Sequence, residues 1–226
     1  MAGIGAGDYW ERDGCRRSAN SYAALWSART RGAFTDLSCP GSTVDDVARQ
    51  LPLVPQGADV VLVEVGGNDI GFGSIAGACF VGGTSSCVAA ADRARAQASQ
   101  LPSRLTPLLA AVQREAPGAR VTAFGYPGLV GLPSQCAASA AGSVISTESV
   151  VALRRVQRAL DAAVRRAAAA AGVGYLDWPA AVNGHSLCSA DPWYVLPGTG
   201  RLDDLLHPTV EATETMAAHL AARISR

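Results

Sequence analysis

The chain has 226 residues, of which 49% are apolar, and its 19 basic and 19 acidic residues balance to a formal net charge of zero. This composition is typical of a globular domain that buries a sizeable core, and it excludes a strong electrostatic field for nucleic acid or an anionic membrane. Because no apolar run reaches the roughly 18 residues of a membrane span, we expect no integral membrane segment.

Helical and strand patterns alternate along the whole chain. Helices are expected over 21–30, 43–51, from the segment after Cys87 to about Glu115, over 147–172 and over 207–226. Strands are expected around Ala33–Leu37 and over 59–69, 119–127 and 173–178. Thr43 and Gly172 have the residue types of an N-cap and a C-cap, and Pro102 predicts an interruption of the helix that ends near Glu115.

This alternation predicts an α/β fold with a doubly wound parallel sheet. The run 59–65 is rich in β-branched residues, as in strands buried on both faces of such a sheet. We find no repeat, linker or low-complexity tail, and therefore expect a single domain over 1–226.

The even number of cysteines favours disulfides and an oxidising compartment, although six buried free thiols are the alternative. The cysteines are Cys15, Cys39, Cys79, Cys87, Cys136 and Cys188, and none forms a Cys-x-x-Cys pair. Six cysteines allow 15 connectivities. The short loop between Cys79 and Cys87 favours pairing in sequential order.

Two candidate oxyanion donors follow predicted strands, at the edge where ligands bind in doubly wound sheets. Asn68, in GGNDIGFG, has a side-chain amide that can stabilise a developing oxyanion. Gly41, in SCPGST, lies between a strand and a helix start, where backbone amides are free to donate. The alternative for each motif is an ordinary turn.

A candidate base and its orienting acid lie just before the last helix. Asp204 and His207, in DDLLHPT, are three residues apart, so we expect the carboxylate to orient the imidazole. His185 is interpreted as a loop hydrogen-bonding residue and His219, within the last helix, as a surface or packing residue. Together with the two donors, this pair predicts an acyl-transfer site that lacks a nucleophile.

These blocks resemble the SGNH (GDSL-type) hydrolases, and among them the secreted esterases and lipases of actinomycetes. Gly41, Asn68 and the Asp204–His207 block match in order and rough spacing, and the likeness covers essentially the whole chain. It implies a flavodoxin-like three-layer sheet and no metal or cofactor. It also implies the disulfides Cys15–Cys39, Cys79–Cys87 and Cys136–Cys188.

The N-terminus departs from the pattern of the family. In the family, the nucleophilic serine stands in a Gly-Asp-Ser-Tyr turn that precedes a stretch resembling AGIGAGDYW. We therefore expect the serine about two positions upstream of Met1, and expect the first strand and the signal peptide to be absent from this chain. No internal serine stands in a comparable motif; those considered are Ser18, Ser21, Ser38, Ser42 and Ser186. Tyr9 does not align as a replacement.

By this likeness the complete protein is a secreted, monomeric serine esterase or lipase that acts on a small ester or a lipid, with no nucleic-acid partner. The segments Gly71–Phe80 and Gly128–Pro133 suit an acyl-chain groove. Carbohydrate acetyl esters are the alternative substrates. A non-catalytic binding module, or pseudoenzyme, is the alternative function, and the chain alone is expected to be inactive.

Overall fold

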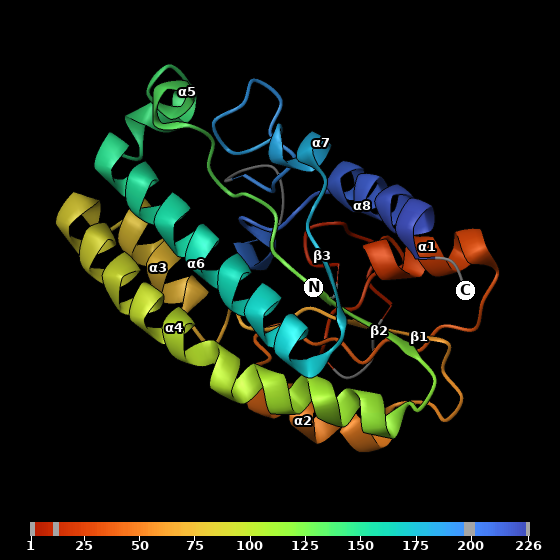
Figure 1. Cartoon of the computed structure of the whole chain (residues 1–226). Coiled ribbons are helices and arrows are strands. Elements are labelled where there is room, and N and C mark those ends of the chain that lie inside the picture. Colours follow the sequence, from red (N-terminus) through yellow and green to blue (C-terminus); the bar gives the residue numbers. More distant parts are fainter. Residues whose placement is uncertain (1–2, 11–13, 197–201, 225–226) are drawn as a thin grey trace.

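The computed structural model describes residues 3–10, 14–196 and 202–224 (Figure 1). The α-helices are α1 (Tyr22–Thr30), α2 (Val44–Gln50), α3 (Phe72–Phe80), α4 (Gly83–Glu115), α5 (Pro133–Ala137), α6 (Thr147–Ala171), α7 (Ala180–Asn183) and α8 (Val210–Arg223). Short 3₁₀ helices cover Leu51–Leu53, Ala140–Ser143 and Leu202–Asp204. The strands are β1 (Val60–Val63), β2 (Arg120–Phe124) and β3 (Gly174–Leu176).

The three strands form a parallel sheet in the order β1-β2-β3, with helices on both faces (Figure 1). Side chains alternate between two hydrophobic clusters, as the period of a strand requires. Val121 and Ala123 of β2 belong to the cluster that contains α4 and α6, whereas Phe124 packs with α1 and α8. This three-layer arrangement confirms the predicted α/β fold.

Helix boundaries follow the capping signals of the sequence. The Thr43 hydroxyl accepts a hydrogen bond from the Asp46 amide, and the Asp46 carboxylate accepts one from the Thr43 amide. This capping box fixes the start of α2. Gly172 ends α6 in the left-handed conformation, with φ of 70°.

The expected interruption at Pro102 is wrong, because α4 continues through both Pro102 and Pro107. Each proline removes one helical hydrogen bond, at a cost of about 3 kcal/mol. Leu101 and Leu105, beside these prolines, are almost completely buried in the core that α4 shares with α6. Burying leucine contributes about 1.5–3 kcal/mol a residue, so packing along the helix offsets the loss.

The expected loop before α4 is also shorter than the sequence suggests. Most of the segment from Gly71 to Phe80 forms α3, and only two residues separate this helix from α4. The disulfide Cys79–Cys87 joins these two helices. The pairs Cys15–Cys39 and Cys136–Cys188 are formed as well, so the implied connectivity is confirmed.

The strand expected around Ala33–Leu37 is wrong, because this segment has no regular secondary structure. A groove of about 420 Å³ separates residues 33–38 from β1, and both segments line it. A strand needs a neighbour to bond its backbone groups, and no strand of the described chain lies between these two segments. The sheet therefore ends at β1.

Within the described ranges, no helix combines the length and the apolar character that a membrane span requires.

Candidate active site

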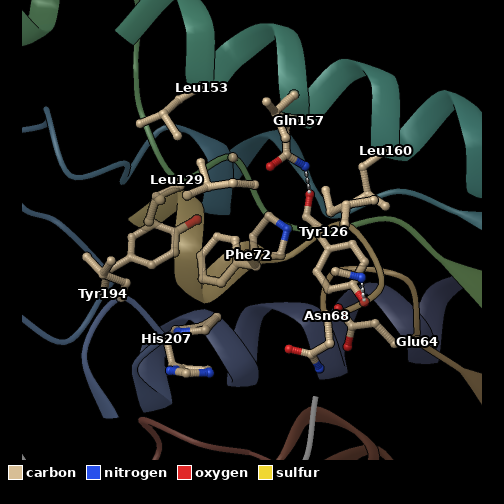
Figure 2. A pocket seen from close by; sticks show the side chains of 18 of the residues that line it. Glu64, Asn68, Phe72, Tyr126, Leu129, Leu153, Gln157, Leu160, Tyr194 and His207 are labelled. Atoms are coloured by element: carbon tan, nitrogen blue, oxygen red, sulfur yellow. Dashed lines mark hydrogen bonds between the residues drawn. The ribbon is translucent and has the colours of Figure 1, made fainter. Parts of the chain in front are cut away.

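Three of the four predicted site residues line one cavity of about 540 Å³ beyond the carboxyl ends of β1 and β2. These residues are Gly41, Asn68 and His207. Figure 2 shows Asn68 and His207 on one side of this cavity and a set of leucines across from them. The structure thus brings an amide donor and an imidazole to the predicted edge of the sheet.

Asn68 is positioned by the sharp turn that follows β1. Gly66 has φ of +121°, and a Cβ there would lie 2.7 Å from a methyl carbon of Leu101, so only glycine suits this position. The Asn68 side-chain amide donates to the Ser42 carbonyl over 3.0 Å. An amide nitrogen has two hydrogens, so one remains for a ligand in the cavity.

Asp69 connects the loop of Asn68 to the loop of Gly41. Its carboxylate accepts the Val44 amide at 3.1 Å and lies 2.9 Å from the Arg104 guanidinium. The side chain is only 3% exposed, and burial raises the pKa of this carboxyl. The partners of Asp69 lie 25 and 35 residues away along the chain, where the spacing of residues in the sequence gives no signal.

The His207 imidazole is held by a backbone carbonyl. Its Nδ1 lies 3.0 Å from the Leu205 oxygen, and because a carbonyl can only accept, Nδ1 carries the proton. Nε2 of the neutral ring is then left with a free lone pair. Burial lowers the pKa of His207, against the opposing effect of the hydrogen bonds with the backbone of Leu205 and Asp204.

The Asp204 carboxylate, which we expected to orient this imidazole, has other partners in the structure. It accepts a hydrogen bond of 2.8 Å from the Tyr9 hydroxyl and is ion-paired with Arg16. Asp204 and His207 are instead joined through the backbone, where the His207 amide donates to the Asp204 carbonyl over 3.1 Å. Neither Tyr9 nor Arg16 was identified as a functional residue from the sequence.

Apolar side chains form most of the remaining cavity wall. Both segments expected to form an acyl-chain groove contribute, and the apolar residues include Ile70, Phe72, Ile75, Leu129, Val130, Leu132, Leu153, Val156, Leu160 and Tyr194. Figure 2 shows Leu129, Leu153 and Leu160 bordering the cavity across from His207. The cavity thus combines a polar edge with an apolar wall.

The chain matches the sequence model of the GDSL-like lipase/acylhydrolase family over residues 1–214. It belongs to this family. It is 36% identical to a lipase of Streptomyces rimosus over 215 residues, which are 92% of this chain and 77% of that protein. Lipase 1 of Streptomyces coelicolor is 31% identical over 212 residues, with the same two shares.

Two solved structures have the same fold as this chain. The extracellular lipase of Streptomyces rimosus superposes with a TM-score of 0.88 at 33% identity, over 97% of this chain and 94% of that one. Phospholipase A1 of Streptomyces albidoflavus superposes with a TM-score of 0.87 at 30% identity, over 99% of this chain and 94% of that one. The family and fold that the sequence resembles are confirmed.

A GDSL hydrolase needs a nucleophile, and no serine of the described chain is hydrogen-bonded to His207. The hydroxyls of Ser18 and Ser38 donate to the Gly7 carbonyl and to Asp36, respectively. The Ser21 hydroxyl caps α1. Ser42 lines the cavity, and its carbonyl accepts from Asn68.

No group of three or more His, Cys, Asp or Glu side chains within the described ranges could hold a metal ion.

Proposed function

We propose that this chain carries the base and the oxyanion-binding groups of a serine ester hydrolase whose substrate has a lipid-like acyl chain. The observation that carries the proposal is the single cavity that Gly41, Asn68 and His207 share. The names of the relatives support hydrolysis of an ester.

In the proposed reaction, the serine oxygen attacks the ester carbonyl carbon while Nε2 of His207 takes the hydroxyl proton. The carbonyl oxygen becomes an oxyanion that accepts hydrogen bonds from the Asn68 side chain and the Gly41 amide. Collapse of this intermediate expels the alcohol, which receives the proton from His207. Water then cleaves the acyl-serine bond by the same two proton transfers.

We further propose that the serine lies upstream of Met1 and reaches the cavity beside the N-terminal loop. Ile4 lines the cavity, and a Cβ at Gly5 would lie 3.1 Å from the Cβ of His207. A residue a few positions before Gly3 can therefore reach the imidazole, since an extended chain spans about 3.3–3.6 Å a residue. Secretion is part of this proposal, supported by the three disulfides and the extracellular relative.

The substrate proposal rests on the apolar wall, which can bury a hydrocarbon chain at about 25 cal/mol for each Å² removed from water. Activity on p-nitrophenyl esters should therefore increase from acetate to medium-chain acyl groups. Preference for acetate would instead favour carbohydrate acetyl esters.

Labelling with a fluorophosphonate tests the nucleophile and the reaction together. The natural gene product and its His207→Ala variant are incubated with the probe, digested and analysed by mass spectrometry. We expect one labelled serine in the natural product, upstream of Met1, and neither labelling nor ester hydrolysis in the variant. The matched control His219→Ala lies in α8 and should keep both.

A label on Ser42 or another internal serine would refute the upstream position of the nucleophile. The absence of both labelling and turnover in a folded natural product would refute the enzyme and support a binding module. Full turnover by His207→Ala would refute the role of the base.

A further inference from the structure

Outside the cavity, a cluster of three side chains joins the N-terminal loop to the segment that carries His207. The Tyr9 hydroxyl donates to Oδ1 of Asp204 over 2.8 Å and accepts the Gly5 amide at 3.0 Å. Arg16 forms an ion pair with the same carboxylate, and its guanidinium lies 4.4 Å from the centre of the Tyr9 ring. Tyr9, Arg16 and Asp204 are absent from the lining of the cavity, so this cluster lies behind the site.

The cluster is largely shielded from water. The side chain of Asp204 is 9% exposed and that of Arg16 is 16% exposed. A carboxylate at such a position is costly unless charge and hydrogen bonds compensate it, and here a guanidinium and a hydroxyl do so. The arrangement is therefore a fixed anchor rather than a mobile surface ion pair.

The anchor connects to His207 through the backbone. The His207 amide donates to the Asp204 carbonyl over 3.1 Å, and Leu206 between them has φ of 63°, a conformation that a leucine rarely adopts. The Leu205 carbonyl in this same turn holds Nδ1 of the imidazole. A shift of the Asp204 backbone would thus move the Leu205 carbonyl, whose hydrogen bond with Nδ1 selects the tautomer of His207.

We propose that Tyr9 and Arg16 are positioning residues for His207, which act by holding the Asp204 carboxylate and through it the turn 204–207. Asp204 then serves as the anchor of the turn, not as the direct partner of the imidazole. The proposal rests on the proposed function in that His207 matters for catalysis as a base, but the geometry itself can be tested without any nucleophile.

A second Tyr-Asp-Arg cluster in the same chain provides a matched control. The Tyr175 hydroxyl donates to Asp177, Arg165 is ion-paired with Asp177, and its guanidinium lies 4.8 Å from the Tyr175 ring. Both tyrosines are partly buried. Tyr175→Phe therefore removes the same kind of hydroxyl from the same kind of partners, away from His207.

The first readout is the histidine tautomer in the 226-residue chain, measured by long-range ¹H–¹⁵N correlation after ¹⁵N-histidine labelling. In the parent chain and in Tyr175→Phe, we expect His207 above its pKa to show one protonated Nδ1 and one unprotonated Nε2. In Tyr9→Phe, we expect the two ¹⁵N shifts of His207 to move toward each other, which indicates a mixture of tautomers. His185 should keep its shifts in all three proteins.

Unchanged His207 shifts in a folded Tyr9→Phe would overturn the proposal. If that variant fails to fold, Arg16→Ala and Arg16→Lys carry the same test: the alanine variant should mix the tautomers and the lysine variant, which keeps the charge, should restore most of the parent signal. Equal His207 spectra for Arg16→Ala and Arg16→Lys would also overturn the proposal.

The second readout is esterase activity of the natural gene product. We expect Tyr9→Phe to lower kcat at least tenfold with KM within twofold, and Tyr175→Phe to leave both unchanged. Unchanged kcat in an active enzyme would refute the positioning role. An inactive parent with the expected change of tautomer would refute the proposed function and leave the positioning of His207 supported.

Discussion

Replacement of Gly5 by alanine tests whether the N-terminal loop is packed against the His207 segment. Gly5 has φ of +93°, and a Cβ there would lie 2.5 Å from the Pro208 carbonyl oxygen and 3.1 Å from the Cβ of His207. Real Cβ atoms do not approach a backbone oxygen so closely, so the loop or the turn must move. Gly7 is the matched control, because its φ of +65° is also positive and nothing lies within 4 Å of its Cβ position.

The two variants separate the cost of backbone conformation from the cost of the contact. A positive φ costs an L-residue about 1–2 kcal/mol, so Gly7→Ala should lower the free energy of unfolding by about that amount. Gly5→Ala has the same penalty and adds a steric term of about 1–3 kcal/mol, as overpacking typically does. We therefore expect Gly5→Ala to lose about 2–5 kcal/mol in total.

Urea unfolding of the 226-residue chain, followed by tryptophan fluorescence, measures both values. Trp26 and Trp178 are buried, so their emission should report loss of the core. Linear extrapolation then gives the free energy of unfolding of each variant. Equal losses for Gly5→Ala and Gly7→Ala would refute a close contact between the loop and the turn that carries His207.

Three further predictions concern the site and its scaffold. In the active gene product, Asn68→Ala should lower kcat about 10²–10³-fold with little change of KM, measured by steady-state ester hydrolysis, and a loss below twofold would exclude it as an oxyanion donor. Because burial lowers the pKa of His207, its NMR titration midpoint should lie below the ordinary value of 6.5, and kcat/KM should rise with pH through that midpoint. The unfolded chain then binds this proton first, so the free energy of unfolding should fall as pH decreases from about 6.5 toward the lower folded pKa; a midpoint above 6.5 would reverse this dependence of stability on pH. Replacing Cys136 and Cys188 by alanine should cost about 4 kcal/mol in urea unfolding, from the entropy of a loop closed over 52 residues, whereas a cost below 1 kcal/mol would contradict this estimate.

Local signals predicted the helices and strands well where neighbouring residues determine the outcome. Thr43 and Gly172 mark helix ends because their caps need only backbone groups a few residues away. The interruption predicted at Pro102 was wrong because the penalty of a proline is local. The burial that outweighs this penalty comes from α6, more than 40 residues further along the chain. The strand predicted at 33–37 was wrong because strand propensity forms no strand without a neighbouring strand to bond its backbone.

The place of a residue at the cavity was predictable where it depends on that residue and its immediate turn. Asn68 and His207 could be found because a glycine turn and a proline accompany them in the sequence. The partners of Asp204 could not, because Tyr9 and Arg16 are 195 and 188 residues away, and three-residue spacing to His207 suggested a closer partner. Spacing indicates which side chains can meet, but the whole fold determines which of them do.

The uncovered edge of β1 beside the groove predicts that self-association of this chain depends on its concentration. β1 is bonded to β2 on one edge, and no strand of the described chain covers the other edge. Such an edge, with apolar residues such as Trp26 and Val112 lining the groove next to it, is a template on which another extended backbone can pair. Self-association through this edge would be at least second order in protein, so dilution would keep the chain dispersed.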